Sequence, residues 1–364
     1  MKVYIGMSGG VDSSVSAALL AEQGYDVTGV YMKNWTSDLP GVRCPWADDL
    51  ADAKRVAVQL GIDFEVFDFE NEYKQRVVDY MIEEYRQGRT PNPDIMCNQE
   101  VKFKLFLNTA LEAGADMIAT GHYAIVSPWS HTTADAGGVV VSEQSGMLLC
   151  MAKDELKDQT YFLYRVTSDA LVKTLFPIGN FTKSEVREKA SERGLYTARK
   201  KDSQGICFVG NVGMRDFLGQ YVPQDPGNII DQGTGRVIGR HDGAIFYTLG
   251  QRHGLDVGGG LPYYVSEKNM ETNEVYVTSD LNSRILWREF IDIKNVHWIN
   301  DAPPEGEYQI RVRHRASLEK ANIQYIDQDI VRVTPSDSIR AITPGQSLVI
   351  YDGRVCLGGG IVVQ

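Results

Sequence analysis

The sequence predicts an α/β chain in which an N-terminal parallel sheet is followed by a small central domain and a C-terminal β-barrel. Strand and helix patterns alternate through the first half, and only short alternating strands appear from about residue 282 onward. The first pattern is typical of a parallel sheet and the second of a barrel or sandwich. The 364 residues exceed one ordinary core. We expect domains at 1–207, 208–281 and 282–364.

The N-terminal sheet is predicted to begin with a strand at residues 2–7 and a helix at 12–23, which Gly24 ends. A second strand at 25–32 and a helix at 47–61, with acidic residues in its first turn, continue the alternation. Strands connected in this way pair in parallel through right-handed crossovers. Ligands of such sheets bind at the carboxyl ends of the strands.

The alternation continues with a strand at 63–69 and helices at 72–86 and 99–114. A further strand is expected at 116–126, and the polar, Gly-rich residues 127–147 are expected to form a surface excursion.

Helical patterning returns over 154–198, and glycine becomes frequent after residue 207. The barrel strands are predicted within 307–316, 322–334 and 346–355. In the first of these, alternation places Arg311, Arg313 and Arg315 on one face, which suits phosphate contact; the alternative is a solvated strand face.

The composition favours a soluble globular protein, with 43% hydrophobic and 23% charged residues. A net charge of −11 argues against a nonspecific nucleic-acid coat but allows local basic patches, such as those at 198–203 and 309–317. No apolar run suits a signal peptide or a membrane span, so we expect a cytoplasmic protein without membrane contact. The odd number of cysteines and the lack of CxxC indicate neither a disulfide framework nor a protein-bound metal.

The stretch "GMSGGVDSSV", residues 6–15, lies where the first strand meets the first helix. It could be a plain turn, since paired glycines relieve backbone strain. However, its glycines leave room for a ligand beside the backbone N–H groups, and Ser8 and Ser13 add hydroxyls. The following helix adds the positive end of its dipole, which together predicts a phosphate cradle. Asp12 beside an anion suggests a bridging Mg²⁺.

Two cysteines lie in settings that favour the thiolate. Cys97 follows a Pro-rich loop at or near the start of a helix, which lowers a thiol pKa, and Asp94 could cap that helix. We expect an exposed, reactive Cys97; the alternative is an inert buried thiol. Cys207 follows the basic segment "RKKDSQGI", and its alternative is a strand residue packed in the core.

The loop resembles the PP-loop, SGGxDS, of enzymes that cleave ATP between its α and β phosphates. Over nearly its whole length the chain resembles the bacterial tRNA-specific 2-thiouridylase family of the PP-loop ATP pyrophosphatase superfamily. The matching stretches include "ADDLADAKRVA", "TPNPDIMCNQEVKF", "ATGHYA", "KDQTYFL", "KKDSQGICFVG", "TLGQRHGL" and "TPGQSLVIYDG". The resemblance implies an adenine nucleotide alpha hydrolase-like domain, a small central domain and a β-barrel.

The resemblance also implies the chemistry. The C2 carbonyl oxygen of the wobble uridine is adenylated with release of pyrophosphate, and a persulfide carried on Cys207 supplies the sulfur that displaces AMP. Cys97 acts as a nucleophile that frees or relays this sulfur, the pair ends as a Cys97–Cys207 disulfide, and Asp94 serves as general acid or base. The implied partners are tRNA and a sulfur donor, either a cysteine desulfurase or a sulfur-relay protein.

The residues implied to bind ATP are Gly6, Met7, Ser8, Gly9, Gly10, Val11, Asp12, Ser13, Met32 and Gly121. Those implied to bind tRNA are Asn92, Pro93, Asp94, His122, Lys157, Asp158, Gln159, Arg313, His314 and Gln346. For Met32 an ordinary core role is an equal alternative, and for His122 a hydrogen-bonded structural role. Ile125, Cys150 and Gln99 stand where the family pattern commonly has basic residues.

Several functions remain open from the residues alone. A related enzyme could thiolate another tRNA base, although enzymes that make 2-thiocytidine typically carry CxxC pairs. A PP-loop ligase acting on a small metabolite would need neither the paired cysteines nor a basic barrel. A nucleotide-binding regulatory protein would show no turnover.

Overall fold

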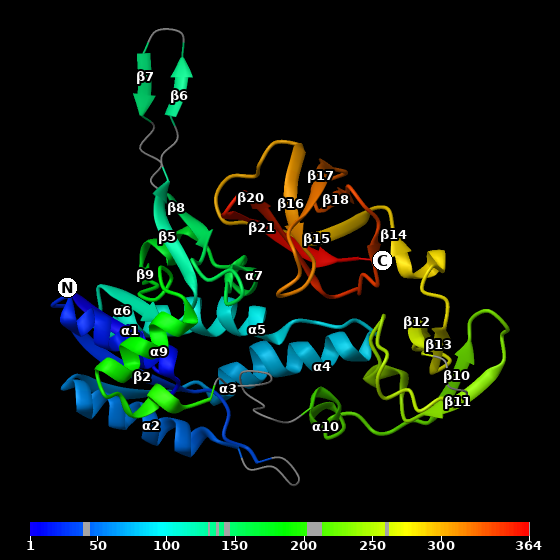
Figure 1. Cartoon of the computed structure of the whole chain (residues 1–364), viewed down its shortest axis with the longest axis horizontal. Coiled ribbons are helices and arrows are strands. Elements are labelled where there is room, and N and C mark those ends of the chain that lie inside the picture. The colour runs from blue at the N-terminus through cyan, green and yellow to red at the C-terminus, as the bar shows by residue number, and fades with distance from the viewer. Residues whose placement is uncertain are drawn as a thin grey trace.

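The computed structural model describes residues 1–38, 44–129, 132–135, 138–141, 146–201, 213–258 and 262–363. The N-terminal α/β part lies at one end of the molecule and the barrel and the central domain at the other (Figure 1). This architecture confirms the predicted fold class. In the described residues, no helix is long and apolar enough to cross a membrane.

The N-terminal part is built on a five-stranded sheet in the order β3-β2-β1-β4-β9, in which every pair is parallel. The strands are β1 (Lys2–Gly6), β2 (Asp26–Lys33), β3 (Asp63–Asp68), β4 (Met117–Thr120) and β9 (Thr174–Leu175). Side chains alternate along β1, so Val3 and Ile5 join one core and Tyr4 joins the other. Both faces of the sheet are therefore covered.

Helices α1 (Val11–Glu22), α2 (Trp46–Leu60) and α9 (Lys183–Glu192) contribute to the core that contains Val3 and Ile5. The opposite core is covered by two long helical runs, each of which contains a π-helical segment. One run consists of α3 (Glu70–Tyr73), η1 (Lys74–Val78) and α4 (Asp79–Arg86). The other consists of α5 (Pro93–Met96), η2 (Cys97–Phe106) and α6 (Leu107–Glu112).

The second run begins six residues before the predicted helix at 99–114. Asn92 caps it, because its side-chain oxygen accepts hydrogen bonds from the N–H groups of Asp94 and Ile95 at 3.2 and 3.4 Å. Pro93 fits the first helical position, where no N–H partner is needed. The expectation that Asp94 caps this helix was therefore wrong, and the proline favours helix initiation.

The strand predicted at 116–126 is in fact two strands in different sheets. After β4 the extended segment is interrupted at 121–123. It continues as β5 (Ala124–Trp129), which pairs with β8 (Gly146–Met151). Strand β8 also pairs with the last strand of the barrel. Within the predicted excursion at 127–147, β6 (Thr132–Asp135) and β7 (Gly138–Val141) form a hairpin that projects from the molecule (Figure 1).

Short helices lie within the α/β part and in the segment that leads from it to the central domain. They are α7 (Thr160–Leu163), α8 (Ser168–Val172), η3 (Tyr196–Arg199) and α10 (Met214–Leu218). The central domain is a four-stranded sheet in the order β11-β10-β13-β12. Its elements are β10 (Gly227–Asp231), β11 (Val237–His241), η4 (Ala244–Phe246), β12 (Tyr264–Asn269) and β13 (Glu274–Thr278).

The barrel has six strands in the order β15-β18-β17-β16-β20-β21 and closes through β15 and β21. They are β15 (Ile291–Trp298), β16 (Gly306–Arg311), β17 (Glu319–Tyr325), β18 (Ile330–Pro335), β20 (Ser347–Asp352) and β21 (Val355–Val362). A linker of η5 (Arg284–Leu286) and β14 (Trp287–Arg288) precedes it, and β14 pairs with β19 (Ile339–Arg340). Closure leaves the barrel without a free edge between these strands.

The prediction that three arginines share one face of a barrel strand was wrong. Strand β16 ends at Arg311, so Arg313 and Arg315 lie in the loop that follows. Arg311 itself is buried, and Arg315 has a left-handed backbone with φ of 64°. Strand alternation therefore does not extend over the three residues.

Candidate functional site

The loop between β1 and α1 is held by its own serines. The Ser8 N–H donates to Ser13 Oγ at 3.2 Å, and the hydroxyls of Ser13 and Ser14 donate to the Gly10 carbonyl at 3.2 and 2.7 Å. Gly9 has φ of 71°, and a Cβ there would lie 2.3 Å from the Asp49 carbonyl oxygen. The loop thus needs glycine at this position both for its backbone angle and for its close approach to α2.

Unbonded donors remain at the end of this loop. The N–H groups of Gly9 and Gly10 donate to no acceptor among the described residues, and α1 begins immediately afterwards at Val11. The first N–H groups of a helix also lack intrahelical partners, and the helix dipole is positive at this end. The arrangement suits a phosphate group.

Asp12 has partners that the sequence did not reveal. Lys183 Nζ lies 2.7 and 2.8 Å from its two carboxylate oxygens, and the Tyr123 hydroxyl donates to Oδ1 at 2.8 Å. Lys183 is the first residue of α9, whose start is fixed by a capping box between Thr182 and Glu185. A cation thus compensates the acid at the start of α1. The capping-box pattern could have located the start of α9 in the sequence, but not its pairing with Asp12.

Glycines bring β1, β2 and β4 close to the loop. A Cβ on Gly6 would lie 2.8 Å from Met32 Cε, and one on Gly121 would lie 2.7 Å from the Ser13 backbone nitrogen. Met32 is partly buried and packs against the core that contains Tyr4. Gly121 therefore lets the end of β4 contact the start of α1, while Met32 packs against the core that contains Tyr4 and Met7 against the core that contains Val3 and Ile5.

Cys97 differs from its predicted setting. It is only 1% exposed and packs in the hydrophobic core, about one turn inside the helical run that Asn92 caps. The expectation of an exposed thiol was wrong, because the run begins earlier and turns this residue inward. Cys207 lies outside the described residues, so its distance from Cys97 stays untested.

His122 lies at the end of β4 in a buried polar contact. Its Nδ1 is 2.8 Å from Thr120 Oγ1, and its Nε2 is 3.5 Å from Lys102 Nζ. Burial, together with the charge of Lys102, holds the pKa of His122 well below its usual value. The imidazole is therefore neutral at physiological pH and is held by structural contacts.

Predicted RNA-binding residues from three distant segments lie around α7. The His314 ring is 4.4 Å from the Phe162 ring, centroid to centroid. Burial and the charges of Arg315, Arg311 and Lys157 lower the pKa of His314 to about 4. Burial raises the pKa of Tyr161, whereas the charge of Arg313 and a hydrogen bond with Asn92 lower it. The Asn92 turn, Lys157 and the loop after β16 therefore meet at α7.

Other predicted RNA-binding residues have internal partners. The Asp158 side chain is 0% exposed, lies 2.9 Å from Arg311 Nη1 and accepts hydrogen bonds from the Thr160 hydroxyl and the Ala152 N–H. Gln159 Oε1 accepts the Tyr123 N–H at 2.9 Å. Asp158 therefore has no surface for RNA in this conformation and instead joins the α/β part to the barrel.

Gln346 also joins two segments, because its side-chain amide donates to the Thr90 carbonyl at 2.7 Å. The Thr90 N–H in turn donates to the Pro344 carbonyl at 2.9 Å. This pair of contacts fixes the barrel loop against the turn that leads to Asn92.

The three residues that depart from the family pattern make the following local contacts. Gln99 Oε1 accepts the Arg165 Nε–H at 2.5 Å, and Arg165 also donates to the Asn295 carbonyl in the barrel. Ile125 and Cys150 are directly opposite each other in the β5–β8 pairing. Burial raises the pKa of Cys150, which disfavours its thiolate form.

Three family models match successive parts of the chain. The tRNA methyl transferase HUP domain matches residues 1–211, the tRNA methyl transferase PRC-barrel domain matches residues 215–279, and the aminomethyltransferase beta-barrel domain matches residues 288–362. The first of these models covers more than half of the chain.

Curated relatives match along almost the whole chain. Proteins described as tRNA-specific 2-thiouridylase MnmA from Bacillus mycoides (strain KBAB4) and Bacillus cytotoxicus are each 45% identical over 365 residues. Each match covers 99% of this chain and 94% of the relative. The chain therefore belongs to the tRNA-specific 2-thiouridylase family.

Proposed function

We propose that this protein is an ATP-dependent tRNA sulfurtransferase that converts the wobble uridine to 2-thiouridine, with release of AMP and pyrophosphate. The observation that carries the proposal is the 45% identity, over 99% of the chain, to relatives described as tRNA-specific 2-thiouridylases. The unbonded amides of Gly9 and Gly10 support it, because they supply donors for a nucleotide phosphate.

ATP would bind at the carboxyl ends of β1, β2 and β4, with its phosphates on the loop at 6–13. The uridine C2 oxygen attacks the α-phosphorus, and pyrophosphate leaves. The loop's own residues hold the phosphate in place, while Lys183 keeps the Asp12 carboxylate compensated and oriented. Mg²⁺ would enter with the nucleotide and offset phosphate charge, and Asp12 is the carboxylate of the loop that could help hold it.

The sulfur step is proposed to use Cys97 and Cys207. The terminal sulfur of a Cys207 persulfide is transferred to C2, AMP leaves with the former carbonyl oxygen, and Cys97 bonds to Cys207 as the disulfide that must be reduced for the next turnover. Asp94, in the first turn of α5, would serve as general acid or base. Since Cys97 is 1% exposed, its thiol must become accessible before it reacts.

The RNA is proposed to bind over α7, between the Asn92 turn and the loop after β16. Enzymes that modify a base within a stack extract it first, and Asn92, Pro93 and Asp94 are the proposed contacts of the extracted uridine. Lys157, Arg313 and His314 would contact the backbone nearby. A cysteine desulfurase or a sulfur-relay protein is the proposed donor, and the cytoplasm is the proposed location.

The direct test incubates the protein with ATP, Mg²⁺, unmodified tRNA, a cysteine desulfurase with cysteine as the source of persulfide sulfur, and a thiol reductant, and then analyses the nucleosides of the digested RNA. We expect 2-thiouridine from the wild type and from Cys150→Ala, a control that keeps the other thiols. Cys97→Ala and Cys207→Ala should both lose the product, while pyrophosphate release that depends on tRNA should persist in both.

Other outcomes would identify the alternatives. Wild-type-like activity of Cys97→Ala would contradict the proposed sulfur step. Pyrophosphate release that proceeds without tRNA would favour a ligase acting on a small molecule. Thiolation at another base would change the target but keep the reaction class.

A further inference from the structure

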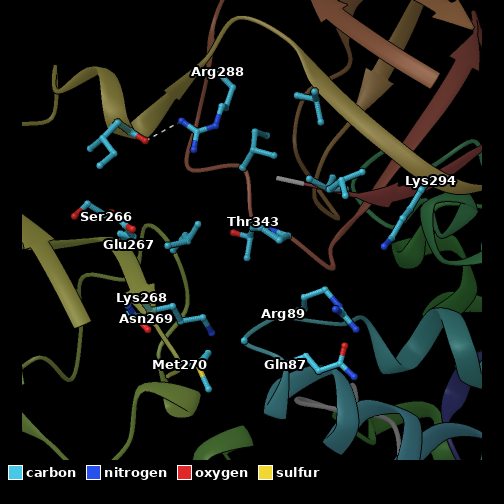
Figure 2. Close-up of a pocket in the computed structure, with 18 of the residues that line it drawn as sticks. Gln87, Arg89, Ser266, Glu267, Lys268, Asn269, Met270, Arg288, Lys294 and Thr343 are labelled. Atoms are coloured by element: carbon cyan, nitrogen blue, oxygen red, sulfur yellow. Dashed lines mark hydrogen bonds between the residues drawn. The ribbon is translucent and has the colours of Figure 1, made fainter. Parts of the chain in front are cut away.

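A cavity lies where the three parts of the chain meet, and it contains none of the residues of the loop at 6–13. It has a volume of about 840 Å³ and is lined by the end of α4, by β12 and by the segments on either side of the barrel (Figure 2). This volume falls within the range of small-molecule sites, about 300–1,000 Å³.

Cations gather in this cavity although the whole chain is acidic, with a net charge of −11. Four cationic residues line it against two acidic ones, Glu267 and Glu271. Arg89 is paired with Glu84 outside the cavity. Lys268, Arg288 and Lys294 have no carboxylate within ion-pair distance in the described part of the chain.

The contacts of these three cations leave them available. Lys268 donates to the Tyr247 carbonyl at 2.9 Å, Arg288 donates to the carbonyl oxygens of Ile285 and Trp287, and Lys294 has no side-chain hydrogen bond with described residues. Figure 2 shows the amine ends of Lys268 and Lys294 directed into the same space. Burial lowers the pKa of Lys268 to about 8, so a bound anion would stabilise its charged form.

An apolar wall completes the cavity. Met270, Phe290 and Ile342 provide apolar surface beside the cationic groups.

We propose that this cavity binds a nucleotide, with its phosphate on Lys268, Lys294 and Arg288 and its base against the apolar wall. Cations match phosphate oxygens, and a flat heterocycle matches the apolar surface. The nucleotide is either a free mononucleotide or one unit of a bound RNA strand. The proposal goes beyond the proposed function, because this site lies apart from the loop that would hold the reacting ATP.

Lysine footprinting tests the site in the full-length protein. The amines are acetylated at pH 7.5 alone, with millimolar AMP, or with unmodified tRNA, and acetylation of each lysine is followed by peptide mass spectrometry. We expect at least fivefold slower acetylation of Lys268 and Lys294 with one of the two probes. Lys320, which is exposed on β17, should change less than twofold. Protection by AMP identifies a free nucleotide, and protection by tRNA alone identifies an RNA strand.

Single variants separate binding in the cavity from binding elsewhere. In Lys294→Gln, half-maximal protection of Lys268 should need at least tenfold more of the effective probe, whereas Lys320→Gln should leave it unchanged. The proposal is overturned if neither probe protects the two lysines. It is also overturned if, in the Lys294→Gln variant, the probe protects Lys268 at the same concentration as in the wild type. Neither readout requires thiolation, so the result is independent of the proposed reaction.

Discussion

The loop at 6–13, the proposed phosphate site, and the proposed RNA surface are assembled in opposite ways. The loop at 6–13 is a single segment whose serines bond to their own backbone. The surface around α7 instead brings together the Asn92 turn, Lys157 and the loop after β16, which is more than 200 residues from Asn92 in the sequence. A local motif thus specifies the first site, and the docking of the barrel determines the second.

The largest expected effect is on this docking. Asp158→Ala should lower the free energy of unfolding by about 3–5 kcal/mol, because it leaves Arg311 as a buried charge without its carboxylate. Urea denaturation measures the change. Glu155→Ala is the matched control, since the Glu155–Arg354 pair also joins the α/β part to the barrel but is exposed. It should cost less than about 1 kcal/mol. Equal costs would contradict the assignment of Asp158 as the main link.

The next effect concerns the local site. Lys183→Met should lower pyrophosphate release that depends on tRNA by about 10- to 100-fold, or about 1.4–2.7 kcal/mol, because Asp12 is left uncompensated beside the phosphates. Lys183→Arg should recover part of the rate, and Lys54→Met on the exposed face of α2 should match the wild type. In a double-mutant cycle, Asp12→Asn should cost much less when Lys183 is already replaced. If the rate losses of the two single variants simply add in the double variant, the Asp12–Lys183 ion pair does not contribute to pyrophosphate release.

A smaller effect is expected on the assembled surface. Arg313→Gln should weaken tRNA binding about three- to tenfold and reduce the slope of log K against log salt by about 0.7–0.9, the amount for one lost phosphate contact. Lys320→Gln, on the exposed side of β17, serves as the control. Fluorescence anisotropy at several salt concentrations measures both quantities. An unchanged salt slope would place Arg313 away from the RNA backbone.

The smallest effect is a pH dependence at the same surface. With the folded pKa of His314 near 4, the unfolded chain binds more protons between about pH 6.5 and 4, so its contribution lowers stability as the pH falls through that window. His314→Gln should remove this contribution and change the dependence of Tm by about 2 °C or less. Thermal unfolding monitored at pH 4.5 and 7 provides the measurement.

The sequence predicted features that depend on neighbouring residues and missed those that depend on distant ones. The alternation of strands and helices and the Gly-Ser loop are local, and both were found. The pairing of Asp12 with Lys183 spans 171 positions, and Asp158 with Arg311 spans 153. Alternation alone placed Arg311 beside Arg313, but a buried carboxylate from another segment turns Arg311 inward. Similarly, Cys97 was expected at a helix start because the capping by Asn92 was not recognised.

The β5–β8 hairpin leaves the parallel-sheet part of the chain and hydrogen-bonds to the barrel through β8 and β21. A shortened chain that ends before residue 282 would remove this pairing and expose the backbone groups of Leu149 and Cys150 at a free strand edge, the kind of template on which chains aggregate. Separate expression of the N-terminal region should therefore yield insoluble protein unless this ribbon is shortened as well.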